Sequence, residues 1–150
     1  MADIKSIEER SRNMAAIKNK DTKPEIFLRK LLFSEGFRYR KNYNKLPGHP
    51  DVWLKKYNTA IFVNGCFWHR HKNCKYAYMP KSRQEFWNNK FENNVQRDSA
   101  IYKLLLSANI KIIIIWECTI RKAKRNEEAK KELLKQIITS LEAKELYVEI

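Results

Sequence analysis

The chain has 150 residues, of which 43% are hydrophobic and 12% aromatic, a composition that suits one globular domain and excludes disordered, collagen-like and disulfide-rich chains. Its 31 Lys and Arg residues outnumber 17 Asp and Glu residues, and the resulting formal charge of +14 is spread along the chain, which indicates a basic face rather than a basic tail. Such a face favours nucleic acid as the partner, with a ribosome-associated or membrane-surface protein as the alternative.

The N-terminus has no positively charged segment followed by an apolar one, so we expect no secretory signal and a cytoplasmic protein. The longest apolar stretch, Ile112 to Trp116, is too short to span a bilayer. Three cysteines cannot all pair with one another, and reduced cysteines near a histidine indicate a metal site.

The first half of the chain predicts a helix followed by paired strands. Ile7 to Lys20 reads as a weak amphipathic helix or a mobile arm. Thr22 as N-cap with Glu25 three residues later predicts a helix that ends at Gly36. The elements expected next are a half-exposed strand over Phe37–Tyr43, a turn over Leu46–Pro50, a strand over Asp51–Leu54, a turn at Tyr57-Asn58 and a buried strand over Thr59–Val63.

The second half predicts two helices and two further strands. Expected are a long helix over Arg83–Leu106 capped by Ser82, a buried strand over Ile110–Trp116, a charged helix over Asn126–Lys144 and an edge strand over Leu146–Ile150. The fold class is therefore α/β, a single domain with a mixed central sheet flanked by helices. We expect an N-terminal DNA-binding arm at 1–20, a core at 21–122, and a C-terminal helical extension of the same domain at 123–150.

All three cysteines and one histidine form a set with the spacing of zinc ligands. Cys66, His71 and Cys74 lie in one short loop, and Cys118 follows the strand that ends at Trp116. Three thiolates and one imidazole complete a tetrahedral shell with no open position, so we predict one structural Zn²⁺. The alternative is buried cysteines and a surface histidine.

Asp51 and His69 are the candidates for chemistry. His69 lies two residues before His71 and would point the other way on an extended loop. If the Tyr57-Asn58 turn makes a hairpin, Asp51 and Val63 lie side by side, and a carboxylate with a backbone carbonyl suits Mg²⁺. The alternative is that Asp51 is only a turn residue.

Two further acids are candidates with an open role. Glu25 can complete the capping box with Thr22, and a helix N-terminus can also hold a catalytic carboxylate. Asp98 falls on the helical stripe of Trp87 and Tyr102, where an acid needs a partner, so function and structural pairing remain equal readings.

Paired aromatic residues stand in basic surroundings at Phe67-Trp68 and Phe86-Trp87. Aromatic wedges can part a base step, while packing in the core is their commoner use. Because the Phe67-Trp68 loop is tight, we favour a contact role for that pair.

Together these segments closely resemble the very short patch repair (Vsr) endonucleases of bacteria. The matching stretches, in order over about residues 10 to 122, are Arg10-Ser-Arg-Asn-Met14, Lys20-Asp-Thr-Lys-Pro-Glu25, Leu46-Pro-Gly-His-Pro-Asp51, Val63-Asn-Gly-Cys-Phe-Trp-His69, Arg83-Gln-Glu-Phe-Trp87, Asn93-Asn-Val-Gln-Arg-Asp98 and Trp116-Glu-Cys118. The last 28 or so residues carry no matching motif.

The resemblance implies a fold related to the restriction-endonuclease PD-(D/E)xK superfamily and nicking 5′ to the thymine of a T:G mismatch, which arises when 5-methylcytosine deaminates. It assigns Mg²⁺ to Asp51 and the Val63 carbonyl, and proton transfer to His69 oriented by Glu25. It also assigns zinc to the four ligands above. The DNA contacts it implies are Arg12, Met14, Asn64, Phe67, Trp68 and Trp87, with Asp98 in support.

The chain departs from the family pattern in ways that bear on the DNA contacts. Relatives can carry a histidine where Asn64 stands, and asparagine can bind phosphate but cannot shuttle protons. Many relatives have arginine at the position of His49, and one extra residue separates His71 from Cys74. The D/E-x-K of the superfamily is absent, as it is in the family.

The expected partner is double-stranded DNA with a T:G mismatch. Mismatch-repair proteins are further candidates, no membrane is expected, and the chain is expected to act as a monomer at the bacterial nucleoid. Two rival functions remain: a Vsr-like nuclease with a different or relaxed target, and a zinc-stapled DNA-binding protein without catalysis.

Overall fold

The computed structural model describes residues 20–150, so the expected N-terminal arm, with Arg12 and Met14, lies outside the described residues. The described helices and strands are α2 (Lys23–Ser34), β1 (Arg40–Lys41), β2 (Val52–Leu54), the short 3-10 helix η1 (Lys55–Tyr57), β3 (Thr59–Asn64), α3 (Gln84–Ser107), β4 (Lys111–Trp116), α4 (Glu117–Arg125), α5 (Glu127–Glu142) and β5 (Tyr147–Glu149). No helix in this part of the chain has the length and apolar character needed to cross a membrane.

The strands form one mixed sheet in the order β1-β2-β3-β4-β5, which confirms the predicted α/β class. β1, β2 and β3 are antiparallel neighbours, while β3, β4 and β5 run parallel. The predicted hairpin is present: Asn58, with φ of 48°, turns the chain between β2 and β3. β5 is the predicted edge strand, paired with β4.

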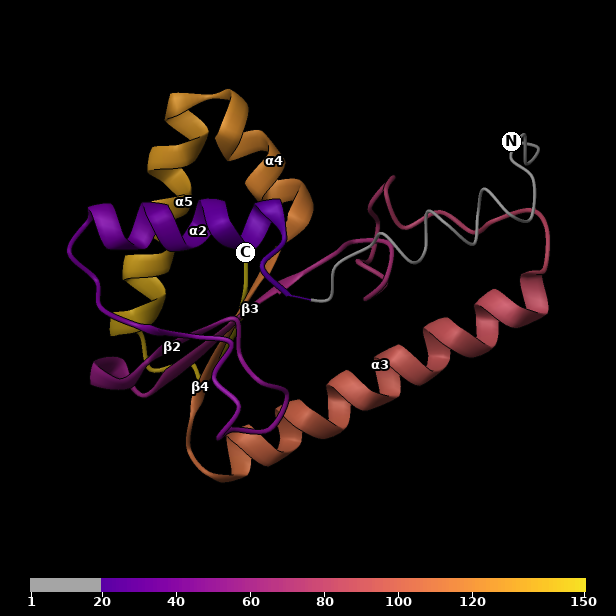
Figure 1. Ribbon diagram of the computed structural model, residues 1–150, viewed down its shortest axis with the longest axis horizontal. Helices are drawn as coiled ribbons and strands as arrows, with labels where there is room; N and C mark the ends of the chain where they lie inside the picture. Colours follow the sequence, from indigo (N-terminus) through magenta and orange to yellow (C-terminus); the bar gives the residue numbers. More distant parts are fainter. Residues whose placement is uncertain (1–19) are drawn as a thin grey trace.

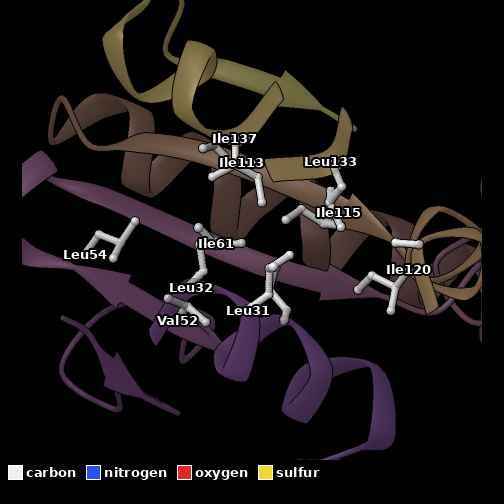
Figure 2. Close-up of a cluster of buried hydrophobic side chains, with 12 residues drawn as sticks. Leu31, Leu32, Val52, Leu54, Ile61, Ile113, Ile115, Ile120, Leu133 and Ile137 are labelled. Atoms are coloured by element: carbon white, nitrogen blue, oxygen red, sulfur yellow. The ribbon is translucent and has the colours of Figure 1, made fainter. Parts of the chain in front are cut away.

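Helices cover both faces of the sheet. Figure 1 shows α2, α4 and α5 on one side and α3 on the other. Alternate residues of the two central strands point to opposite faces, so Ile61 and Ile113 join one cluster while Phe62 and Ile112 join the other. Figure 2 shows the first cluster, in which side chains of α2 and α5 meet the sheet. Because both faces are covered, every residue of β4 is buried, as its β-branched run predicts.

α3 lies against the sheet only at its C-terminal end. Leu105 is fully buried there, Phe91 is the only other buried residue of the helix, and the rest extends beyond the sheet (Figure 1). A helix of 24 residues is about 36 Å long. The expected apolar stripe is therefore incomplete, and Val95 is 45% exposed.

Three details differ from the sequence prediction. The strand expected over 37–43 shrinks to β1, because Asn42 with φ of 46° ends it and the rings of Phe37 and Tyr39 pack on the core. The N-cap position of α3 is Arg83, in a left-handed conformation, and not Ser82. The sequence predicts no element over 117–125, yet this segment forms α4, whose polar sequence buries only Ile120 and Ala123.

Candidate active site and metal centre

One broad cleft brings together most of the predicted site residues. It has a volume of about 1010 Å³ and is lined by the first turn of α2, the segment before β2, the C-terminal end of β3 and one face of α3. Among the residues that line it are Glu25, Asp51, Val63, Asn64, Trp68, His69 and Asp98. These side chains come from segments up to 73 positions apart (98 − 25), so the sheet and α3 assemble the site.

Asp51 occupies the position that the hairpin predicts, next to Val63. Its Oδ2 accepts a hydrogen bond from the backbone N–H of Val63 at 2.7 Å. Continuing the β2–β3 register from Val52 opposite Ile61 places Pro50 opposite Val63. Proline has no N–H, so it cannot donate to the Val63 carbonyl, and that oxygen keeps its capacity to accept a ligand.

Burial raises the pKa of the Asp51 carboxyl from its ordinary 3.8 to about 7, and the negative charge of Glu25 adds to the effect. The Val63 N–H and the positive charge of Arg29 act in the opposite direction. A second carboxylate close enough to raise the pKa of the first marks a place where a cation would relieve the repulsion. The donor set therefore fits a hard divalent ion such as Mg²⁺.

Glu25 lies in the first turn of α2, three residues after the N-cap Thr22 as the capping pattern predicts, although its side-chain bond differs from that of a capping box. Thr22 Oγ1 accepts the Glu25 N–H at 3.5 Å, but Glu25 Oε2 accepts from the backbone N–H of Asp21 at 2.7 Å. The same oxygen lies 3.3 Å from Nη2 of Arg29, one helical turn along. Both side chains are buried, so the pair is fixed beside the N-terminal end of β2.

The Nδ1 atom of His69, in the loop after β3, lies 2.5 Å from Oδ2 of Asp98 on α3. The expectation that Glu25 orients His69 is wrong in this respect, because the carboxylate that contacts the imidazole is Asp98. The chain spacing could not show this, since α3 is aligned with the loop only by packing. Asp98 thus has the partner that its place on an apolar stripe required.

The loop that carries both histidines is a series of turns, not the extended segment expected. The N–H groups of His69 and His71 donate to the carbonyls of Gly65 and Cys66, both at 3.0 Å. Arg70 between them has φ of 55°, a left-handed conformation that reverses the chain direction. The two imidazoles therefore diverge, as predicted, for a different geometric reason.

The predicted zinc ligands converge. One ligand atom from each of Cys66, His71, Cys74 and Cys118 lies within 4.8 Å of the others. Cys118 Sγ is 3.5 Å from His71 Nδ1, close to the ligand separation in a tetrahedral shell with bonds of about 2.0–2.3 Å. The N–H of Cys118 also donates to Cys66 Sγ at 3.4 Å. This group can hold a metal ion such as zinc, joining the loop after β3 to the start of α4.

The aromatic residues gather into one cluster at the N-terminal part of α3. Phe67 is its centre, with ring centroids of Trp68 and Trp87 at 5.0 and 5.5 Å and that of Phe91 at 5.0 Å. The guanidinium of Arg70 stacks 3.9 Å from the centroid of Phe91. Phe67, Trp68 and Trp87 are only half-buried, so the cluster is partly packed and partly open to a ligand.

Asn64 ends β3 and is buried, with Nδ2 donating to the Tyr102 hydroxyl at 3.0 Å. Three residues that hold this site were absent from the sequence prediction: Arg29, Asn42 and Tyr102. The signal for Arg29 was available, because an arginine one turn after Glu25 interrupts the apolar stripe of Leu28, Leu31 and Leu32.

The cleft combines carboxylates and an acid-paired histidine in a strongly basic chain, an arrangement suited to an endonuclease. The family model described as DNA mismatch endonuclease Vsr matches residues 2–76. The chain belongs to this family.

Relatives named as DNA-cutting enzymes cover most of the chain. The chain is 40% identical over 137 residues to the Type II nicking enzyme V.NmeAIP of Neisseria meningitidis serogroup A, covering 91% of this chain and 97% of that protein. It is 39% identical over 139 residues to the DNA mismatch endonuclease Vsr of Escherichia coli K12, covering 92% and 88%. It is 42% identical over 102 residues to the Type II nicking enzyme V.HpaIIP of Haemophilus parainfluenzae, covering 68% and 72%.

Proposed function

We propose that this endonuclease cuts one strand of duplex DNA 5′ to the thymine of a T:G mismatch, in a Mg²⁺-dependent reaction. The observation that carries the proposal is the cleft in which Asp51, Glu25 and the His69–Asp98 pair meet. Relatives named as a mismatch endonuclease and as nicking enzymes support the cutting of a single strand at a defined site. The fold is proposed to be a variant of the PD-(D/E)xK nucleases. The mixed sheet and the place of Asp51 at the β2–β3 hairpin support this proposal.

The proposed Mg²⁺ ligands are the Asp51 carboxylate and the Val63 carbonyl. A bound Mg²⁺ would supply polarisation of the scissile phosphate and stabilise the charge that develops on it. Arg29 contributes one positive charge beside three acids, Asp21, Glu25 and Asp51, which leaves a negative site suited to a cation.

His69 is proposed to move the proton during hydrolysis. An ionised Asp98 can only accept, so Nδ1–H of the neutral imidazole donates to it and Nε2 is left with its lone pair. Nε2 can then take a proton from a water that attacks the phosphorus. In this proposal Asp98 fixes the tautomer and the ring orientation, a role that the family resemblance implies for Glu25.

Contact with DNA is proposed for the half-buried aromatic cluster and for the N-terminal segment. Phe67, Trp68 and Trp87 would wedge into the base stack. Asn64 would line the phosphate path. Arg12 and Met14, in the N-terminal segment, are proposed as further DNA contacts. One structural Zn²⁺ per chain, bound to the four ligands described above, would keep this loop in place.

The direct test is a nicking assay on a labelled duplex with a single T:G mismatch and on its fully paired control. A Mg²⁺-dependent nick at the mismatched thymine is the expected result. Equal cutting of the paired duplex would indicate a relaxed or different target, and binding without cutting would indicate a DNA-binding protein. Because a chelator can also remove zinc, Mg²⁺ is omitted in one arm, and Zn²⁺ alone is returned after chelation in another.

Replacing Asp98 with asparagine is expected to lower the nicking rate about 100-fold or more, since losing the aspartate behind a general-base histidine can cost about 10⁴-fold. The affinity for mismatched DNA should change little, because Asp98 acts through His69. Single-turnover rates and a binding titration would be compared with Glu92→Gln, a neutral control on the exposed face of α3. Unchanged nicking in Asp98→Asn would remove the His69–Asp98 pair from the mechanism.

A further inference from the structure

Arg29 is a buried arginine near the cleft whose guanidinium contacts four other residues. It is 5% exposed and projects from α2 toward the N-terminal end of β2. Its Nε and Nη2 donate to the backbone carbonyl of Asp51 at 3.3 and 3.2 Å. Nη2 also lies 3.3 Å from the Glu25 carboxylate, so one guanidinium touches both Glu25 and the backbone of Asp51.

Two further side chains fix the guanidinium plane. Nη1 donates to Asp21 Oδ1 at 2.8 Å, and Nη2 donates to Asn42 Oδ1 at 3.0 Å. Asn42 in turn donates through Nδ2 to the same Asp21 oxygen at 2.9 Å. The three residues form a closed network, and a planar fork of donors satisfies such a network as an ammonium group cannot.

The same network holds the main chain on which Asp51 stands. The Asp51 carbonyl accepts from the N–H of Asn42 at 3.3 Å as well as from Arg29. At the other end of the residue, the Asp51 carboxylate is held by the Val63 N–H. Asp51 precedes β2 and lies outside the strand ladder, so these contacts replace the ladder in fixing its position.

We propose that Arg29 is the positioning residue of this site, which sets the backbone of Asp51 and the carboxylate of Glu25 so that both acids face the cleft. The proposal rests on the proposed function for the meaning of that geometry, although the geometry itself can be tested without DNA. Arg29 touches neither phosphate nor water in this role. It acts through the two acids.

The test compares Arg29→Met, Arg29→Lys and the exposed control Arg38→Met. The first readout is amide hydrogen exchange of Val63 in the zinc-loaded protein without Mg²⁺, with Ile113 of β4 as the reference for global opening. Arg29→Met is expected to speed exchange at Val63 about tenfold or more while Ile113 changes little. Arg29→Lys, which keeps the charge but not the fork, is expected to lie between. Equal acceleration at both amides, or none at Val63, would overturn the proposal.

The second readout is a calorimetric titration with Mg²⁺ alone. If Arg29 only repelled the cation, its removal would strengthen Mg²⁺ binding, whereas loss of positioning weakens it. We expect weaker binding in both Arg29 variants, a nicking rate lowered about 10- to 100-fold in Arg29→Met, and no change in Arg38→Met. Stronger Mg²⁺ binding in Arg29→Met would contradict the proposal. If the wild-type protein neither binds Mg²⁺ nor nicks DNA, the proposed function fails while the exchange result still decides the role of Arg29.

Discussion

Replacing Asp51 with asparagine is expected to abolish nicking. At pH 8 and without Mg²⁺, the same change is expected to raise the free energy of unfolding above that of the wild-type protein. Loss of nicking by a factor of about 1,000 or more is expected, because the proposed cation loses its charged ligand. The gain in stability has a separate cause. The buried Asp51 carboxylate is ionised at pH 8 at a cost to folding, and the neutral amide removes this cost while it can still accept the Val63 N–H.

The sign of the pH dependence follows from the raised pKa. The pKa of Asp51 is about 7 in the folded protein against 3.8 ordinarily, so the folded state holds the proton more tightly. The destabilisation is therefore complete above about pH 7 and fades as the pH falls toward 4. A shift of this size corresponds to at most about 4 kcal/mol at 1.36 kcal/mol per unit. The advantage of Asp51→Asn should be largest at pH 8 and disappear near pH 4.

Urea unfolding of zinc-loaded protein without Mg²⁺, at several pH values, measures this difference. Asp21→Asn is a matched control, for which the change in the free energy of unfolding at pH 8 is expected to have the opposite sign. Hydrogen bonds from Asn42 and Arg29 hold the pKa of Asp21 below its ordinary value, so its loss should destabilise the protein at pH 8. A finding that Asp51→Asn is no more stable than wild type at pH 8, or still nicks at a comparable rate, would contradict the proposed site.

Replacing Cys118 with serine is expected to remove the zinc, lower the melting temperature by about 10 °C or more and abolish nicking. Zinc bound by such a shell contributes about 10–16 kcal/mol in small zinc domains, and part of that should appear here as folding energy. The effect reaches the cleft because His69 lies in the chain between the ligands Cys66 and His71. Without zinc, the burial of Cys66 and the contact of His71 with Trp116, with ring centroids 4.2 Å apart, remain to hold the loop.

Metal analysis of the purified protein, with thermal unfolding and the nicking assay, tests this expectation. The neighbouring variant Thr119→Ser is a control for a change in the first turn of α4 that leaves all four ligands intact. Zinc at one ion per chain in wild type and Thr119→Ser, but not in Cys118→Ser, is expected. Full activity in wild-type protein purified without zinc would show that the cluster does not need a metal.

Most of the helices and strands could be predicted from the sequence because each is encoded locally. The same is true of the pairing of Asp51 with Val63 and of the Cys/His group. The cap at Thr22, the β-branched run of β4 and the turn at Asn58 all depend on neighbours within a few residues. The hairpin then brings Asp51 to Val63, since a short turn leaves two strands little freedom of register. The four candidate metal ligands could be predicted because three of them share one loop and the fourth follows the adjacent strand. The helix α4 could not be predicted, because its sequence is mostly polar and only two of its residues form an apolar face.

The sequence by itself determined the fold class, the candidate metal-ligand set and the choice of Asp51 and His69 as candidates for chemistry. Only the tertiary structure decided which acid meets which base. His69 and Asp98 lie 29 positions apart, and their contact depends on how α3 packs against the loop after β3. Arg29 reaches Asp51 over 22 positions, because the packing of α2 against the sheet fixes that distance. Spacing along a chain predicts which residues can share a helix face or a strand. The pairing of side chains across elements follows from the packing of the whole core.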